Sequence, residues 1–263
     1  MSRPIFERDG ERVVPTALAR GPWDPGHCHG GAPAALLAAT VDAVPSLVPM
    51  QGVRLTYDLL RPVPLSPLQV HTRIVREGKR VQVVETWLTT DHATELMRCR
   101  ALRLRIGEVD LPGGAVVDDA PPTTGPDELE RLADLQGWEA DGFWRAVDVR
   151  MVSGMLGEAG PGTAWFRVVA PLADGLALTP LARVAATADF GNGIGSPLPM
   201  ATHLFVNPDL SVHLDRLPEG EWLAMASHSV AQATGNGLTT STLYDRGGRI
   251  GLAAQSLYVE GSR

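Results

Sequence analysis

Hydrophobic and polar residues in the first part of the chain form one helical segment and several alternating segments. Residues 34–44 are rich in alanine and leucine and nearly free of charge, so they predict a helix that is buried on almost every side. Pro33 suits the first turn of this helix, and Pro45 ends it. An Asp-Gly turn predicts a hairpin over residues 6–13. Alternation with a period of two predicts strands at residues 68–74, 81–87 and 96–104.

The same order of elements recurs in the second part of the chain. Residues 144–150 and 163–169 predict two strands. Residues 181–190 predict a helix, for which Thr179 and the proline after it supply the N-cap and the first turn. Residues 191–193, Gly-Asn-Gly, are expected to end this helix. Further strands are predicted at residues 211–214, 222–232, 238–244 and 250–259.

This recurrence predicts an α+β protein made of two related halves. Each half would be an antiparallel sheet wrapped around a central helix, and the two would pack as a pseudo-dimer. Residues 107–137 are rich in Gly, Pro, Asp and Thr and predict a linker, with a short helix at residues 127–135. We therefore expect an N-terminal domain over residues 1–106 and a C-terminal domain over residues 138–263.

Composition and charge narrow the classes of function. The chain is 44% hydrophobic and 20% charged, which is typical of a globular protein, and its net charge of −7 disfavours nucleic acid as a partner. No apolar run approaches the roughly 20 residues of a membrane-spanning helix. Charged residues follow the N-terminus, where a signal peptide would be apolar. These features predict a cytoplasmic protein.

The two cysteines, Cys28 and Cys99, are too few for a disulfide framework and lack the spacing of a zinc site. We interpret both as reduced, apolar side chains. His27, Cys28 and His29 are consecutive, and three consecutive residues cannot surround one ion tetrahedrally. We therefore expect neither a metal nor a redox cofactor.

An ordered set of short motifs connects the chain with a known family. The motifs are His29-Gly-Gly-Ala-Pro-Ala-Ala-Leu-Leu, Leu60-Arg-Pro62 with Val75-Arg-Glu-Gly-Lys-Arg-Val81, Ala186-Thr-Ala-Asp-Phe190, and Ala253-Ala-Gln-Ser256. In this order, and over nearly the whole chain outside the linker, they resemble the acyl-CoA thioesterase II-like proteins of double hot-dog fold. The resemblance implies an acyl-CoA substrate and hydrolysis of its thioester. It also implies sheets that often extend or stack between subunits, which would allow a homo-oligomer.

The resemblance implies a catalytic Asp, Thr and Gln in the second half of the chain. The Asp corresponds to Asp189 and the Gln to Gln255. Where the family has its Thr, a simple register gives Asn207, whereas a small gap would bring Thr202 there. An asparagine can hold a water molecule but cannot replace a hydroxyl in a proton relay. In the first half, Ala101 is the register counterpart of Gln255, so we expect one site, in the second half.

The chemistry of these residues supports several interpretations. Asp189 lies in the last turn of an apolar helix, where the helix dipole and burial would raise its pKa toward that of a general base, or it could cap the following turn. Gln255 lies on the inner face of a predicted strand, where its amide could orient a water or satisfy a backbone group. Gly30 and Gly31 could bind an oxyanion through their N–H groups, or permit close packing of helix on sheet.

The leading prediction is an acyl-CoA thioesterase in which Asp189 assists attack by a water that Gln255 and Asn207 hold. A non-catalytic protein that binds acyl-CoA or an acyl carrier stays open, because Asn207 departs from the family pattern. The Asn207-Pro208 dipeptide also prompts a hot-dog dehydratase or hydratase, although Phe205 stands where that motif has its Asp. An α/β-hydrolase is disfavoured because no G-x-S-x-G motif occurs.

Overall fold

The computed structural model describes residues 3–112, 119–135 and 141–261. The first half contributes one long helix, α1 (Gly31–Ala43), preceded by a short 3-10 helix, η1 (Ala17–Ala19). Its strands are β1 (Phe6–Asp9), β2 (Arg12–Pro15), β3 (Met50–Leu59), β4 (Leu68–Arg76), β5 (Val81–Thr89) and β6 (Glu95–Arg105).

The second half repeats this plan around α4 (Pro180–Ala188), which α5 (Gly191–Ile194) follows almost at once. Shorter helices precede it: η2 (Pro126–Glu128), α2 (Leu132–Leu135) and α3 (Phe143–Ala146). Its strands are β7 (Val147–Ser153), β8 (Gly162–Val168), β9 (His203–Val206), β10 (Asp209–Leu214), β11 (Leu223–Ala231), β12 (Asn236–Asp245) and β13 (Gly248–Gly261).

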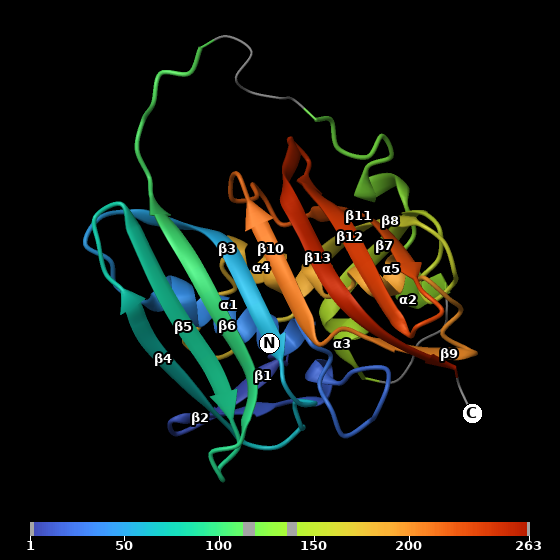
Figure 1. The fold of residues 1–263 in the computed structure, drawn as a ribbon, viewed down its shortest axis with the longest axis horizontal. Coiled ribbons are helices and arrows are strands. Elements are labelled where there is room, and N and C mark those ends of the chain that lie inside the picture. The colour runs from blue at the N-terminus through green and yellow to red at the C-terminus, as the bar shows by residue number, and fades with distance from the viewer. Residues whose placement is uncertain (1–2, 113–118, 136–140, 262–263) are drawn as a thin grey trace.

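The two half-sheets join edge to edge into one antiparallel sheet of 13 strands (Figure 1). Its order is β1-β2-β4-β5-β6-β3-β10-β13-β12-β11-β8-β7, and β9 pairs with β13 outside this path. In Figure 1 the sheet lies in front, with the first half-sheet on the left and the second on the right, and α1 and α4 lie behind it. The prediction of two sheet-around-helix units is therefore confirmed, and hydrogen bonding between β3 and β10 makes their sheets continuous.

The β3–β10 pair is held by residues that alternate between the two faces of the sheet. Leu55 pairs with Val212, and Tyr57 pairs with Leu210; all four side chains are completely buried on the helix side. The Tyr57 hydroxyl donates to the carbonyl of Ala34, 3.0 Å away, and so ties this central strand to α1. Burial of these side chains makes the junction part of the core of both halves.

Helices α1 and α4 pack on one another beneath the sheet. Residues 31–39 of α1 are all buried, as its nearly uncharged sequence predicts. Asp42, near the end of α1, hydrogen-bonds Thr179, the N-cap of α4. The end of one helix thus meets the beginning of the other.

Several predicted boundaries are wrong. Pattern analysis missed β3, whose alternation is interrupted by a bulge between Gly52 and Arg54, and it missed β9, which has only four residues. The strand expected over residues 144–150 begins as the helical turn α3, and the short helix expected over residues 127–135 is divided between η2 and α2. Residues 191–193 do not end the second helix; they form α5, because the two residues before them keep a right-handed helical backbone.

Part of the predicted linker packs on the outer face of the second half-sheet. The indole Nε1 of Trp165 donates to the carbonyl of Thr124 over 2.8 Å, and Arg150 Nη1 donates to the carbonyls of Pro126 and Leu129 over 2.7 and 3.1 Å. Linker residues 113–118 and 136–137 lie outside the described part of the chain. None of the helices within the described ranges is long and apolar enough to cross a bilayer.

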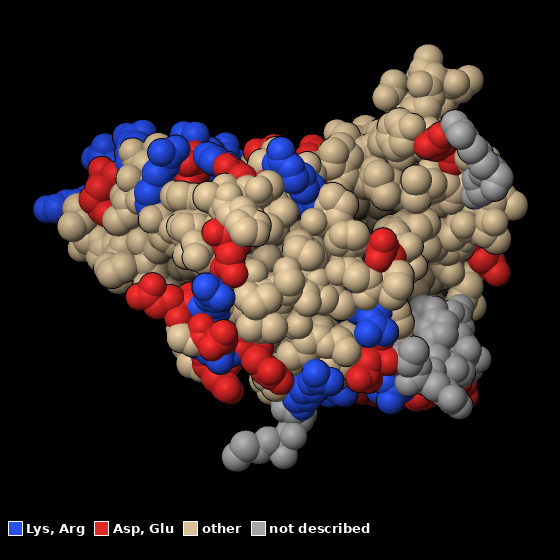
Figure 2. Space-filling view, turned by 90° about the horizontal axis from the view of Figure 1, so that it is seen from below, with Lys and Arg blue, Asp and Glu red and all other residues tan. Residues whose placement is uncertain are grey.

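A cluster of opposite charges lies on the outer face of the first half-sheet. Glu85 is 3% exposed and accepts hydrogen bonds from three arginines on neighbouring strands, Arg73, Arg98 and Arg100, at 2.6 to 3.3 Å. Figure 2 shows that Lys and Arg gather along the upper left edge of the molecule in that view, despite the net charge of −7. Positive charge is thus locally concentrated on an acidic protein.

Candidate active site

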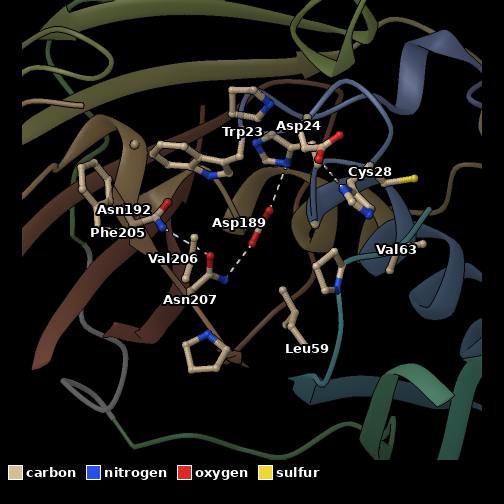
Figure 3. Close-up of a pocket in the computed structure, with 18 of the residues that line it drawn as sticks. Trp23, Asp24, Cys28, Leu59, Val63, Asp189, Asn192, Phe205, Val206 and Asn207 are labelled. Carbon is tan, nitrogen blue, oxygen red and sulfur yellow. Dashed lines mark hydrogen bonds and ion pairs between the residues drawn. The ribbon is translucent and has the colours of Figure 1, made fainter. Parts of the chain in front are cut away.

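Asp189 lies at the C-cap of α4, and its carboxylate meets residues from both halves of the chain (Figure 3). Nδ1 of His29, from the segment before α1, lies 3.0 Å from Oδ2. Nδ2 of Asn207, in the turn between β9 and β10, donates to Oδ1 over 3.0 Å. Asp189 is 6% exposed, so these partners take the place of solvent around the carboxylate.

The pKa of Asp189 is lowered, contrary to the prediction from its place in the helix. Burial by itself would raise this pKa, but it is outweighed by the hydrogen bond and charge of His29 and by hydrogen bonds from Asn207 and the Gly31 N–H. The helix end and the apolar neighbours can be read from the sequence, whereas these donors lie far from Asp189 along the chain and only the fold brings them to it. Asp189 is therefore an ionised hydrogen-bond acceptor at neutral pH.

His29 is the residue that the sequence analysis missed as a partner of Asp189. Its ring packs against Phe143 and Phe190, with ring centroids 5.0 and 4.5 Å away, and these two rings also contact one another. Because an ionised carboxylate only accepts hydrogen bonds, the hydrogen in this contact is on Nδ1, and in the neutral form of the ring Nε2 is then the acceptor. The position of His29 at the start of the glycine motif before α1 could have indicated a role in the site. From the sequence, its chemistry was considered only as that of a metal ligand.

The two ends of the α1–α4 contact differ in chemistry. At one end Asp189, at the C-cap of α4, meets His29 just before α1. At the other end Asp42 of α1 meets Thr179, the N-cap of α4. A hydroxyl stands there in place of an imidazole. The duplication therefore produces a His–Asp pair at one end and a Thr–Asp pair at the other.

Asn207, and not Thr202, lies in contact with Asp189. Besides the bond to Asp189, Nδ2 of Asn207 donates to the carbonyl of Asp209 over 3.2 Å. Thr202 is exposed, and its hydroxyl bonds the carbonyl of Pro199 and Nδ1 of His203. The register without a gap, which gives Asn207, therefore leads to the residue that contacts the Asp189 carboxylate. The register with a gap, which gives Thr202, does not.

Gln255 lies one layer behind the carboxylate. Its Oε1 accepts the backbone N–H of Asn192 over 3.1 Å, and its Nε2 donates to the main-chain carbonyl of Asp189 over 3.5 Å. With 1% of its surface exposed, Gln255 satisfies backbone groups at the α4–α5 junction, as one of the two sequence interpretations proposed.

Arg103 in the first half makes a contact like that of Gln255. Its Nη1 donates to the carbonyl of Val44, the C-cap of α1, over 2.8 Å, as Gln255 does to the C-cap of α4. Ala101, the predicted counterpart of Gln255, has no side-chain donor that could make such a contact.

Gly30 and Gly31 allow the two helices to approach closely. A Cβ on Gly30 would lie 2.8 Å from Oδ2 of Asp189, and one on Gly31 would lie 2.5 Å from the carbonyl oxygen of Ala186. The Gly31 N–H lies 3.1 Å from Nδ1 of His29 and hydrogen-bonds the Asp189 carboxylate, which is its acceptor when Nδ1 carries a hydrogen. Gly30, the N-cap of α1, is on the wall of the cavity described next.

A cavity of about 960 Å³ opens beside the carboxylate. Its polar wall includes His29, Asp189, Asn192 and Asn207. Its apolar wall includes Trp23, Leu59, Val63, Met97 and Phe205 (Figure 3). The rings of Trp23 and Phe205 meet edge to face with centroids 5.8 Å apart, which joins a loop of the first half to β9 of the second. A large, mainly apolar cavity with a few convergent polar groups is typical of a small-molecule site.

Cys28 also lines this cavity, but its chemistry differs from that of a nucleophile. Burial raises the pKa of the Cys28 thiol to about 12, so the sulfur stays protonated at neutral pH. Both cysteines are free. Among the described residues, no three His, Cys, Asp or Glu side chains come together as a set of metal ligands would.

Comparison with known proteins identifies the family. The acyl-CoA thioesterase N-terminal domain matches residues 19–104, and the acyl-CoA thioesterase C-terminal domain matches residues 126–259. The second match alone spans half of the 263-residue chain. No curated protein matches the chain.

Solved structures share the fold over almost their whole length. A Thermobifida fusca YX protein with the provisional name thioesterase II has a TM-score of 0.72 at 19% identity, covering 97% of this chain and 95% of its own. An Alicyclobacillus acidocaldarius protein of unknown function with a hot-dog fold has a TM-score of 0.71 at 17% identity, covering 98% and 96%. The acyl-CoA thioesterase II TesB2 of Mycobacterium marinum has a TM-score of 0.64 at 18% identity, covering 94% and 97%.

The domain matches and the shared architecture agree with the motifs that suggested the resemblance. The two sheet-around-helix halves form a double hot-dog, and each half corresponds to one of the two matched domains. The chain therefore belongs to the acyl-CoA thioesterase family.

Proposed function

We propose that this protein hydrolyses acyl-CoA thioesters, with His29 as the general base and Asp189 as the carboxylate that orients it. The observation that carries the proposal is the 3.0 Å contact between Nδ1 of His29 and Oδ2 of Asp189, on the wall of a cavity of about 960 Å³. This contact favours the tautomer whose Nε2 can accept a proton. It also changes the predicted role of Asp189, since its two oxygens are engaged by His29 and Asn207.

The proposed reaction needs one proton to move twice. Nε2 of His29 takes a proton from water as the water oxygen attacks the thioester carbonyl carbon. The tetrahedral intermediate collapses, the carbon–sulfur bond breaks, and the imidazolium returns the proton to the leaving thiolate. The products are a carboxylic acid and the free thiol of CoA. Asp189 stabilises the imidazolium between the two transfers.

Other residues of the wall would assist these steps. Asn207 donates to Asp189 Oδ1 and so supports the orientation of the carboxylate toward His29. Gly30, at the N-terminus of α1, is placed where the positive end of the helix dipole could stabilise an oxyanion. The apolar wall, with Trp23, Met97 and Phe205, would bury the acyl chain.

Thiol release from a panel of acyl-CoAs tests the proposal, with wild type compared with Asp189→Asn and His29→Gln. Each substitution should lower kcat/KM by roughly 10²–10⁴-fold, the usual contribution of a positioned acid–base group. Asp174→Asn, a change at an exposed carboxylate, is the matched control and should retain wild-type rates.

Two results would contradict the proposal. Saturable binding of acyl-CoA with thiol release no faster than background would favour the non-catalytic binding protein instead. Thiol release that is unchanged in both Asp189→Asn and His29→Gln would show that this pair does not catalyse the reaction, whatever the activity of the wild type.

A further inference from the structure

Asn192 connects two of the site residues, Asn207 and Gln255, although its sequence context predicted only a helix-ending turn. It lies in α5 on the wall of the cavity and is 9% exposed. Its side-chain Nδ2 donates to Oδ1 of Asn207 over 3.3 Å, and its backbone N–H donates to Oε1 of Gln255 over 3.1 Å. In Figure 3 dashed lines run from Asn192 to Asn207 and on to Asp189.

The orientation of the Asn207 amide depends on its neighbours. Its NH₂ group donates in two directions, to Oδ1 of Asp189 and to the carbonyl of Asp209. If oxygen and nitrogen were exchanged, the amide oxygen would face both of these acceptors, and its nitrogen would face the NH₂ of Asn192. A donor from Asn192 therefore favours the orientation that supplies Asp189 with a hydrogen bond.

The backbone that carries Asn192 is itself held. Gln255 is completely enclosed and accepts the Asn192 N–H, so α5 presents its side chain from a fixed position. A side chain whose backbone is already fixed loses little further conformational entropy when it hydrogen-bonds a neighbouring side chain. Asn192 thus has both the donor and the rigidity that orientation of Asn207 requires.

We propose that Asn192 is a positioning residue for thioester hydrolysis, which holds Asn207 with its NH₂ group toward Asp189 and so keeps the carboxylate directed at His29. This inference rests on the proposed function. Hydrogen bonds to an ionised carboxylate favour its charged form, so the arrangement agrees with the lowered pKa of Asp189. The residue acts through Asn207 rather than on the reacting atoms.

The test compares Asn192→Ala, Asn192→Asp, Asn207→Ala and the double variant Asn192→Ala/Asn207→Ala. Loss of one hydrogen bond should lower kcat/KM about tenfold in Asn192→Ala. The double variant should be no slower than Asn207→Ala, since both changes break one chain of contacts.

Asn192→Asp separates orientation from packing. Aspartate has the size of asparagine but only accepts hydrogen bonds when ionised, so it cannot donate to Asn207. It should be at least as slow as Asn192→Ala. Wild-type rates in Asn192→Asp would show that only the volume of the side chain matters, and additive losses in the double variant would show independent action. Either result would overturn the inference.

A second measurement does not depend on hydrolysis. Carbon-13 NMR can follow the carboxyl of Asp189 in the free protein, where Asn192→Ala should raise the pH at which this group titrates. Asn236→Ala, at the exposed start of β12, is the control. If wild type releases no thiol, the proposed function fails. The titration still tests whether Asn192 supports the hydrogen bond from Asn207 to Asp189. An unchanged Asp189 titration in Asn192→Ala would overturn the inference, and a raised one would sustain it.

Discussion

Gln255 donates to the main-chain carbonyl of Asp189 and not to its carboxylate. Nε2 of Gln255 lies 3.5 Å from that carbonyl oxygen, and Oε1 accepts the N–H of Asn192 over 3.1 Å. The buried amide thus joins α4 to α5 directly behind the site. A residue that satisfies backbone groups in this way contributes to stability as well as to the geometry of the site.

Gln255→Ala should therefore lower the stability of the whole protein. The change leaves the buried N–H of Asn192 without its acceptor, which costs about 1–3 kcal/mol. Thermal unfolding should show Tm lower by about 2–6 °C. A variant with an unchanged Tm and no thiol release would contradict this account and would place Gln255 in direct contact with the reacting groups.

The stability of the protein should depend on the charge of Asp189 at low pH. Its pKa is lower in the folded protein than its ordinary value of 3.8, so folding is favoured by its ionised form. This contribution is fully present above about pH 4 and is lost as the pH falls through the folded pKa, below the ordinary value.

Urea unfolding between about pH 4 and pH 2.5 measures this effect. The difference in unfolding free energy between wild type and Asp189→Asn should shrink as the pH falls through this range. The exposed change Asp174→Asn should leave the profile of the wild type unaltered. A difference that grows as the pH falls would mean that the pKa of Asp189 is raised rather than lowered.

Gly31→Ala should separate the ends of α1 and α4. The added Cβ would lie 2.5 Å from the carbonyl oxygen of Ala186 and 2.9 Å from the ring of Phe143, so backbone has to move. We expect a loss of about 1–3 kcal/mol in urea unfolding and slower thiol release, since His29 lies two residues away. Gly107→Ala is the matched control, because its Cβ would meet nothing closer than 3.9 Å. Equal stabilities for the two variants would refute the close-packing role.

Glu85→Gln should destabilise the first half-sheet. The substitution keeps the shape of the side chain but removes the charge that Arg73, Arg98 and Arg100 share. Since the arginines are partly exposed, solvent screens them, and we expect a loss of only about 1–2 kcal/mol. Urea unfolding in low and high salt should show this loss decreasing as salt rises. Glu7→Gln, on an exposed edge, serves as the control; a salt-independent loss would indicate a packing effect.

Much of the fold could be predicted because burial leaves a pattern along the chain. The nearly uncharged composition of residues 34–44 predicted a helix buried on almost every side, and alternation predicted most strands. The strand β3 was missed because a bulge at Gly52 interrupts its alternation, and the turn α5 was missed because Gly-Asn-Gly is typical of a helix end. Local propensity was overridden there by packing against β11 and β13.

The sequence by itself determined the architecture through its periodicity, and through the family motifs it proposed three site positions, Asp189, Asn207 and Gln255. Only the tertiary structure decided what these residues contact. The crossing of α1 and α4 brings His29 to Asp189 from 160 positions away along the chain, and it reverses the direction of the pKa shift. Pattern analysis accounts for neighbours along one element, whereas a buried carboxylate responds to donors that reach it through space.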